Sequence, residues 1–479
     1  MRRAAPVTLR RIAACVAALC VCAPAAAEPF MAGADISSLP VHEGRSAVYS
    51  DQSGPGDAIG ILSDSGANYF RLRLFVNPQG KNNFNGNNDP FVAQSLSYTI
   101  ALAQRVKAAG GKLLLDFHYS DTWADPGHQW KPLAWRSHAT LPALEQQVYD
   151  YTKQSIEAFK AANVMPDMVQ IGNEIASGML WNNEYVPTNQ LSDATVGGAN
   201  TGYPWTGGQN SAGFDRLATL LSAGIRGTRD GSDPGDEPLL MIHHDQGTRW
   251  DRTSYFFDRL LPRLQTNGTD IDVIGYSYHP TFHAGGVTAV AQNLNNTAAT
   301  YGKKVVIAET GFPARNPQSD EQNLGFDVTP EGQRQFLEAV VNTVQNVPND
   351  MGMGVFWWYA EARPTSGLNV YEGGRYGLFD QNGSLQPAAS VFEQFLPAPG
   401  DFNRDGFVDT ADYTVWRNGF DTGEFDEDDY ADWKANFGTT PGGGGSSVQS
   451  IVPEPTGVAL VAILLLLTSA RSFARIDRV

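Results

Sequence analysis

The sequence predicts an α/β fold, a (β/α)8 barrel followed by a small α-helical calcium-binding module. Short apolar runs alternate with helix-like segments between residues 30 and 396, as expected for parallel strands that are joined by helices. Two of these runs, 168–171 and 305–308, are each followed closely by a glutamate. After residue 399 the composition becomes acidic, and a 17-residue repeat follows.

Eight apolar runs are short enough to be strands, and six longer segments have the spacing of amphipathic helices. Together they predict a closed TIM barrel with long loops. The predicted strands are 32–36, 69–75, 112–117, 168–172, 239–243, 273–278, 305–309 and 354–358. The predicted helices are 95–109, 141–162, 214–229, 252–264, 287–301 and 331–344. Two Asn- and Gly-rich loops, 80–90 and 182–211, would overhang the catalytic face or serve as plain surface connections.

Composition and charge exclude several classes of protein. The formal net charge is −17, which argues against a nucleic-acid partner. Residues 1–27 have the basic start, apolar run and Ala-x-Ala end of a signal peptide. All three cysteines (Cys15, Cys20 and Cys22) lie within it. The mature protein would therefore have no disulfide, no thiol nucleophile and no Cys-ligated zinc.

Glu174 and Glu309 are the candidate catalytic residues. Glu174 follows Asn173 at the end of the fourth predicted strand, and Glu309 ends the seventh, so both would lie at the catalytic end of a barrel. A pair of carboxyls there is typical of a glycosidase. We expect Glu174 to be the general acid/base, Glu309 to be the nucleophile, and the Asn173 amide to bind a sugar hydroxyl. The distance between the carboxyls, about 5–5.5 Å in retaining and about 6.5–9.5 Å in inverting enzymes, does not follow from the sequence.

Five stretches of residues 28–396 resemble family 53 of the glycoside hydrolases, the arabinogalactan endo-β-1,4-galactanases. They are GADISSLP (33–40), FRLRLFVNP (70–78), LLLDFHYSDTWADPGHQWKPLAW (113–135), VQIGNEIASGMLW (169–181) and AETGFP (308–313). The third stretch is the most specific. The resemblance implies a retaining endo-β-1,4-galactanase that hydrolyses the galactan chains of type I arabinogalactan by double displacement, without a cofactor for catalysis.

The resemblance also implies substrate-binding residues. They are Asn173, Arg71, His118, Asp121, Trp123, His244, Tyr278 and Trp358. Arg71, or Arg73 in its place, would hold the charge of the nucleophile. Tyr278 would hydrogen-bond Glu309, and Trp358 or its neighbour Trp357 would form an apolar floor under the sugar.

The sequence departs from the family at two places. Tyr278-His279-Pro280 stands where Tyr-Tyr-Pro is expected, and Trp357-Trp358-Tyr359-Ala360 stands where Tyr-Trp-Glu-Pro is expected. Both departures bear on the shape of the sugar subsites. Two alternatives therefore stay open: another retaining endo-β-glycanase of the same superfamily, acting on mannan, xylan or β-glucan, and a non-catalytic glycan-binding or scaffold protein.

Residues 400–438 resemble a dockerin-type module. Residues 401–412 match a calcium loop, with glycine at its sixth position. The candidate ligands are Asp401, Asn403, Asp405, Asp409, Asp412 and the backbone carbonyl of Phe407. Residues 413–420 repeat as 430–437, but the second loop lacks early ligands. The resemblance implies one calcium site and a cohesin-like partner; chance acidic clustering is the alternative.

The end of the sequence resembles a sorting signal. A Gly- and Ser-rich linker, 439–451, precedes residues 452–479, which contain Val-Pro-Glu-Pro, an apolar run and three arginines. This pattern resembles a PEP-CTERM signal, which export sorting machinery would process. The apolar run of residues 456–470 is short for a membrane span, which needs about 20 residues, although a plain membrane anchor is the alternative. We expect an exported protein, extracellular or held at the cell envelope.

Overall fold

The computed structural model describes residues 29–439 apart from 79–87, 139, 182–210, 322–323, 404–405, 421 and 424. They divide into two compact units, one of Pro29–Pro397 and one that begins at Ala398. The predicted signal peptide and sorting signal, nearly all of the linker, and most of both long loops lie outside the described residues. Within the described part of the chain, no helix is long and apolar enough to cross a membrane.

The first unit is built on a closed barrel of eight parallel strands, in the order β1-β10-β9-β8-β7-β6-β5-β4. The strands are β1 (Met31–Asp35), β4 (Tyr69–Leu74), β5 (Lys112–Phe117), β6 (Met168–Ile171), β7 (Leu239–His244), β8 (Val273–Tyr278), β9 (Lys304–Thr310) and β10 (Gly352–Trp357). The predicted barrel is confirmed, and each predicted strand end lies within two residues of the observed one.

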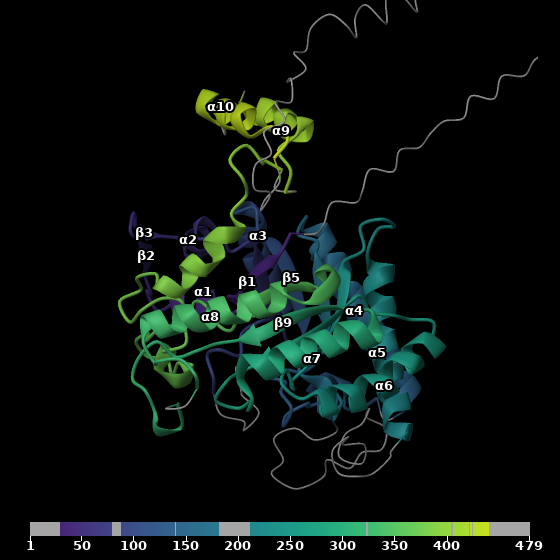
Figure 1. Ribbon diagram of the computed structural model, residues 1–479. Helices are drawn as coiled ribbons and strands as arrows, with labels where there is room; N and C mark the ends of the chain where they lie inside the picture. The colour runs from purple at the N-terminus through teal and green to yellow at the C-terminus, as the bar shows by residue number, and fades with distance from the viewer. Residues whose placement is uncertain are drawn as a thin grey trace, which may run out of the picture. The chain divides into compact units, whose positions relative to one another are not determined.

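Helices surround the barrel on its outside (Figure 1). They are α3 (Leu96–Ala108), α4 (Leu141–Ala161), α5 (Ser211–Gly231), α6 (Trp250–Thr266), α7 (Gly286–Tyr301) and α8 (Pro330–Gln345). Polar caps fix where some of them begin: Ser95 accepts a hydrogen bond from the backbone of Tyr98, and Thr329 accepts one from Gly332. All six predicted helices are present.

Four short elements escaped the sequence analysis because they are too short to show a period. They are α1 (Leu39–Glu43), α2 (Ala58–Asp64) and the hairpin of β2 (Tyr49–Asp51) and β3 (Gly54–Gly56). All four lie between β1 and β4 in the chain.

The barrel interior has an apolar layer and a polar layer. The apolar layer consists of Met31, Tyr69, Leu114, Met168, Met241, Val273, Val306, Ala308, Met353 and Phe356. Further along the same strands, inward positions carry Arg71, Asp116 and Gln170, all fully buried. The apolar layer therefore closes one end of the barrel, and polar side chains converge at the carboxyl ends of the strands, where active sites of such barrels lie.

The second unit pairs two helices, α9 (Thr410–Phe420) and α10 (Glu427–Asn436). The ring of Trp416 stacks on Tyr430 with centroids 4.6 Å apart. The Trp416 indole donates to the backbone carbonyl of Asp426, and the Trp433 indole donates to that of Asp409. Trp433 follows Trp416 by 17 positions, and Asp426 follows Asp409 by 17 positions. The sequence repeat therefore corresponds to a repeated contact.

Candidate active site

Glu174 stands in a tight turn at the end of β6. Gly172 has φ of 85°, and a Cβ there would lie 2.7 Å from the Ile175 side chain, so a larger residue would not fit. Glu174 itself is left-handed, with φ of 50° and ψ of 49°, a conformation that is uncommon for any residue but glycine. The Ser277 hydroxyl on β8 donates to Glu174 Oε1 at 2.5 Å. The turn and this contact together fix the acid side chain at the mouth of the barrel.

Glu309 reaches the same mouth because β9 has an irregular register. Tyr276 pairs with Ile307, but the next residue, Ser277, pairs with Glu309. The extra residue is Ala308, which faces the apolar layer inside the barrel. Such a bulge lets consecutive residues point to the same side and is frequent beside active sites. Glu309 consequently points inward as well.

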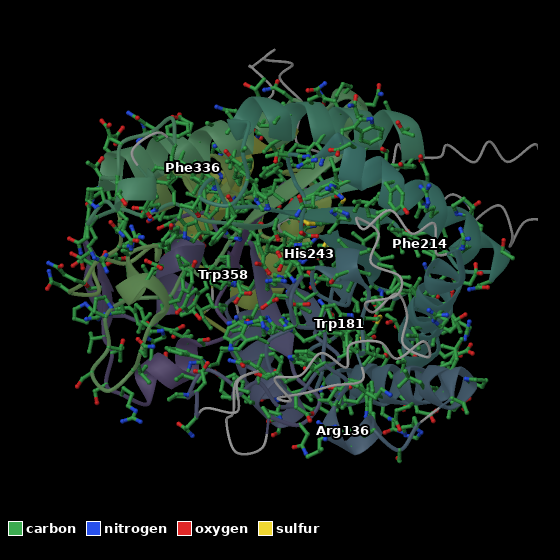
Figure 2. The ribbon with its side chains drawn as sticks, turned by 90° about the horizontal axis from the view of Figure 1, so that it is seen from below. Arg136, Trp181, Phe214, His243, Phe336 and Trp358 are labelled. Atoms are coloured by element: carbon green, nitrogen blue, oxygen red, sulfur yellow. The ribbon has the colours of Figure 1, made fainter. Side chains whose placement is uncertain are left out.

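The two glutamates line one cavity of about 480 Å³. Its walls are Asp125, Pro126, Glu174, Asp245, Gln246, His279, Thr281, Phe282, His283, Glu309, Trp358, Tyr371 and Tyr376. In Figure 2, His243 and Trp358 lie toward the middle of the barrel, whereas Phe336 and Phe214 lie among the outer helices. The cavity combines acidic groups with aromatic rings, the composition expected of a sugar-binding site.

Arg71 is the fully buried cation beneath Glu309. Its Nη1 lies 2.7 Å from Glu309 Oε1 and 2.9 Å from Asp35 Oδ2. Its Nη2 lies 2.8 Å from Asp116 Oδ2. A planar guanidinium has five N–H donors in a fork, so it can contact three carboxylates from two of its nitrogens. Of the two arginines considered from the sequence, Arg71 is the one that holds Glu309.

These charges separate the pKa values of the two catalytic candidates. Burial alone would raise the pKa of Glu309, but Arg71, followed by His279 and His243, holds it well below its usual range. Burial raises the pKa of Glu174 well above its usual range, and the charges of Glu309 and Asp245 raise it further. Two neighbouring carboxyls with pKa values shifted in opposite directions are typical of an acid and a nucleophile that work together.

Asn173 connects Arg71 to the catalytic turn. Its Oδ1 accepts from Arg71 Nη2 at 2.8 Å and from Gln170 Nε2 at 2.9 Å. Its Nδ2 donates to the carbonyl of Ala124 at 2.8 Å, which leaves the second Nδ2 hydrogen for another acceptor. His243 contacts Asn173 Oδ1 through Nδ1 and Ser277 Oγ through Nε2, each at 2.9 Å.

Two predicted site residues, His244 and Tyr278, do not line the cavity. His244 lies outside the cavity and packs edge-on against Phe256 of α6, and burial lowers its pKa to about 3. Tyr278 stacks on Phe336 of α8 and does not contact Glu309 in any described hydrogen bond. Alternation along the strands turns these two side chains outward. The inward positions belong to His243 and Ser277, and His279 Nε2 lies 3.8 Å from Glu309 Oε2.

Trp358 is one of the two tryptophans predicted to form an apolar floor under the sugar. It lines the cavity beside Glu309, and the centroid of its ring lies 5.8 Å from that of the His279 ring and 5.1 Å from that of the Tyr371 ring. Trp357 is fully buried outside the barrel, where its indole donates to the carbonyl of Tyr376 at 2.8 Å. Of the two tryptophans, only Trp358 can meet a ligand in this cavity.

The three predicted residues that follow β5 lie around the site and do not line the cavity. His118 Nε2 is 3.0 Å from Asp116, a neighbour of Arg71, and its Nδ1 accepts from the backbone of Ala124. Asp121 accepts from the backbone of Leu133 at 2.8 Å. The guanidinium carbon of Arg73 lies over the Trp123 ring, 4.2 Å from its centroid. These contacts position the loop after β5.

Sequence reasoning missed several functional candidates. Asp35, Asp116 and Gln170 surround Arg71, while Asp125, Asp245, Gln246, Phe282, Tyr371 and Tyr376 line the cavity. Asp116 and Gln170 each stand two positions after an apolar-layer residue on the same strand, and Asp35 is the last residue of β1. Polar residues inside predicted buried strands were the signal that could have found Asp116 and Gln170.

Two carboxylates of the predicted calcium loop accept hydrogen bonds from its backbone. The Asp412 carboxylate accepts backbone hydrogen bonds from Asn403 at 3.0 Å and from Asp409 at 2.8 Å. Asp401 accepts from the backbone of Gly406 at 3.0 Å. Asp405 lies outside the described residues. Among the residues that are described, no group of three or more His, Cys, Asp and Glu is placed to hold a metal ion.

Replacing Glu309 with Gln tests the electrostatic link between the two glutamates. Removing the Glu309 charge makes ionisation of Glu174 easier, so the pKa of Glu174 should fall toward its usual value while remaining raised by burial. The measurement is a ¹³C NMR titration of labelled glutamate carboxyls, with Glu174→Gln to assign the signal. An unchanged Glu174 pKa would mean that the two groups do not interact.

Comparison with known proteins places these observations in a family. Residues 31–392 match the model of glycosyl hydrolase family 53. A protein named probable arabinogalactan endo-β-1,4-galactanase A, from Aspergillus terreus, is 36% identical over 70% of this chain and 87% of its own length. The arabinogalactan endo-β-1,4-galactanase of Thermothelomyces thermophilus is 32% identical over 76% of this chain and 98% of its own length.

Solved structures agree with this assignment. The family 53 catalytic domain of Ignisphaera aggregans has a TM-score of 0.63 at 27% identity, covering 77% of this chain and 96% of that domain. A structure from a study of two fungal β-1,4-galactanases has a TM-score of 0.61 at 30% identity, covering 76% of this chain and 99% of the other. The chain belongs to glycosyl hydrolase family 53.

Proposed function

We propose that the protein is a retaining endo-β-1,4-galactanase that hydrolyses the galactan chains of type I arabinogalactan. The observation on which this rests is the pair of carboxyls, Glu174 and Glu309, with opposite pKa shifts on one cavity. The substrate follows the names of the relatives, which are arabinogalactan endo-β-1,4-galactanases.

In the first step, the Glu309 carboxylate attacks the anomeric carbon of the sugar. The bond from this carbon to the glycosidic oxygen breaks, and Glu174 gives its proton to that oxygen, so that the leaving chain departs neutral. In the second step, the Glu174 carboxylate takes a proton from water, which attacks the anomeric carbon and releases Glu309. Two inversions at this carbon retain the β configuration of the product.

The charges around the site suit both steps. Arg71 stabilises the ionised Glu309 before attack. Once Glu309 is esterified its charge is gone, and the pKa of Glu174 falls because Glu309 is the largest of the neighbouring charges that raise it. Glu174 is then able to remain ionised and act as a base. The same residue therefore changes from acid to base without a change in the fold.

Other side chains would bind the sugar. Trp358 offers an aromatic face beside the nucleophile, on which the apolar face of a galactosyl ring can pack. The remaining Nδ2 hydrogen of Asn173 can donate to the hydroxyl next to the reacting carbon. Arg71 and His118 act through Glu309 and Asp116 and are positioning residues, as are Asp121 and Trp123 in the loop after β5.

Hydrolysis of purified polysaccharides tests the function and the catalytic pair together. We expect the full chain to release reducing ends from β-1,4-galactan in preference to mannan, xylan and β-glucan. Glu174→Gln and Glu309→Gln should each lower kcat at least about a hundredfold, since each removes a group that acts in the transition state. ¹H NMR of the first products should show the β anomer.

Three results would contradict parts of this proposal. Preferred cleavage of another glycan would overturn the substrate and keep the mechanism. An α anomer as first product would make the enzyme inverting. Binding of galactan by folded protein, with no cleavage of any of these glycans, would favour a non-catalytic glycan-binding protein.

We further propose that residues 400–438 form a dockerin-like calcium module and that residues 1–27 and 452–479 direct export and sorting. The backbone contacts of Asp401 and Asp412 support the first part, because both side chains match calcium ligands and both accept hydrogen bonds from the backbone of the same loop. With calcium bound, the module would offer its two repeated helices to a cohesin-like partner. The sorting segment would hold the enzyme at the cell envelope or release it after processing.

Calcium should raise the melting temperature of the second unit. Binding to the folded loop and not to the unfolded chain stabilises the fold. The measurement is calorimetry of the full chain with calcium and with chelator, and Asp412→Ala as a matched variant should lose the difference. Identical melting curves with and without calcium would contradict a calcium site in this loop.

A further inference from the structure

We propose that His279 is a positioning residue that donates a hydrogen bond from Nε2 to Glu309 Oε2 and so directs the nucleophile toward the sugar. This inference rests on the proposed function. His279 stands where the sequence departs from the Tyr-Tyr-Pro pattern of the family, and it follows directly after β8. Its ring lines the cavity of the catalytic pair, and its Nε2 lies 3.8 Å from Glu309 Oε2.

The two carboxylate oxygens of Glu309 have different partners. Oε1 lies 2.7 Å from Nη1 of Arg71, which is fully buried and does not line the cavity. The partner of Oε2 is His279, which does line it. Oε2 is therefore the oxygen on the cavity side and the one that can attack a sugar there. Arg71 holds the other oxygen and stabilises the charge, whereas a donor to Oε2 sets the direction of attack.

Strand β8 and the residue after it provide a partner for each glutamate. The Ser277 hydroxyl donates to Glu174 Oε1 at 2.5 Å, and His279 stands two positions further along the chain. Residues two positions apart on a strand point to the same side, so Tyr278 between them points outward, against Phe336. In the barrel order β8 lies next to β9 and two strands from β6. One segment can therefore fix the acid and the nucleophile relative to each other.

The surroundings of His279 hold its ring in one orientation. The backbone amides of Phe282 and His283 both donate to the carbonyl of His279 at 2.9 Å, and the amide of His279 donates to His283 Nδ1 at 2.9 Å. The imidazole packs edge-on against Trp358, with centroids 5.8 Å apart, and against Phe282, with centroids 6.3 Å apart. A contact of 3.8 Å is longer than a hydrogen bond, and a movement of about 1 Å completes it. Catalytic hydrogen bonds often shorten in this way when substrate binds.

Two variants separate the hydrogen bond from the packing of the ring. His279→Phe keeps an aromatic ring beside Trp358 but has no donor, whereas His279→Tyr brings a hydroxyl donor. We expect His279→Phe to lower kcat on β-1,4-galactan at least about tenfold, the size of one hydrogen bond to a charged group. His279→Tyr should stay within about threefold of the wild type. Tyr278→Phe, which removes an outward-facing hydroxyl from the preceding residue, is the matched control and should leave kcat unchanged.

The pKa of Glu309 is the second readout, measured by carboxyl ¹³C titration of the same variants. His279 is one of the neighbours that lower this pKa, after Arg71. In His279→Phe the pKa of Glu309 should rise but remain below its ordinary value, because Arg71 still stabilises the carboxylate. It should rise less in His279→Tyr and not at all in Tyr278→Phe. A side chain that only packs against its neighbours would not move this pKa.

Three results would overturn the inference. An unchanged Glu309 pKa in His279→Phe would show that the two side chains do not interact. A raised pKa without a loss of kcat, or an equal loss of kcat in the Phe and Tyr variants, would show that the donor does not direct the nucleophile. If the wild-type protein cleaves none of the glycans, the proposed function fails, and the titration still decides whether His279 contacts Glu309, so the two failures are distinguishable.

Discussion

The active site depends on one buried cation, Arg71, shared among three carboxylates. Its guanidinium contacts Asp35, Asp116 and Glu309, and it also donates to Asn173 beside Glu174. Removing a charged partner from a buried network costs about 3–5 kcal/mol, because the remaining charges lose compensation. The network holds the nucleophile in its ionised form and anchors the turn that carries the acid.

The opposite pKa shifts of the two glutamates follow from what each one touches. Glu309 touches a cation, and Glu174 touches the Ser277 hydroxyl and faces other carboxylates. Loss of contact with water raises the pKa of both glutamates, so this effect does not distinguish them. Charge placement distinguishes them. Arg71 on β4 reaches across the barrel to the Glu309 carboxylate on β9, whereas on the side of β6 it donates to the neutral side-chain oxygens of Gln170 and Asn173. The order of the strands in the barrel therefore gives the two glutamates different chemical roles.

The sequence was sufficient to predict the barrel, its eight strands and the positions of Glu174 and Glu309 at strand ends, since apolar runs and the carboxyls that follow them are local patterns. It did not predict which residue of a neighbouring pair faces inward. The residues that flank His243–His244 and Ser277–Tyr278 are apolar on both faces of the strand, as in most buried parallel strands. The sequence therefore does not indicate which face points into the barrel. In the structure, Met241 and Val273 belong to the apolar layer inside the barrel, and His243 and Ser277 lie on the same faces of their strands.

The bulge at Ala308 had no sequence signal either, and without it Ala308 and Glu309 would face opposite sides of β9. Glu309 was found because a glutamate at a strand end is itself unusual, whichever way it points. Phe282 and the cavity walls come from loops, where neither period nor residue type indicates which side chains meet. Their positions depend on turns such as the one that His283 closes.

The most direct test is to assign the pKa values of Glu174 and Glu309 separately in the wild-type protein, by carboxyl ¹³C titration with each Glu→Gln variant used only for assignment. We expect that at pH 4.5, the ordinary pKa of a glutamate, Glu309 is ionised and Glu174 is protonated. If instead Glu309 titrates at or above the pKa of Glu174, Arg71 does not determine which glutamate is the nucleophile and which is the acid.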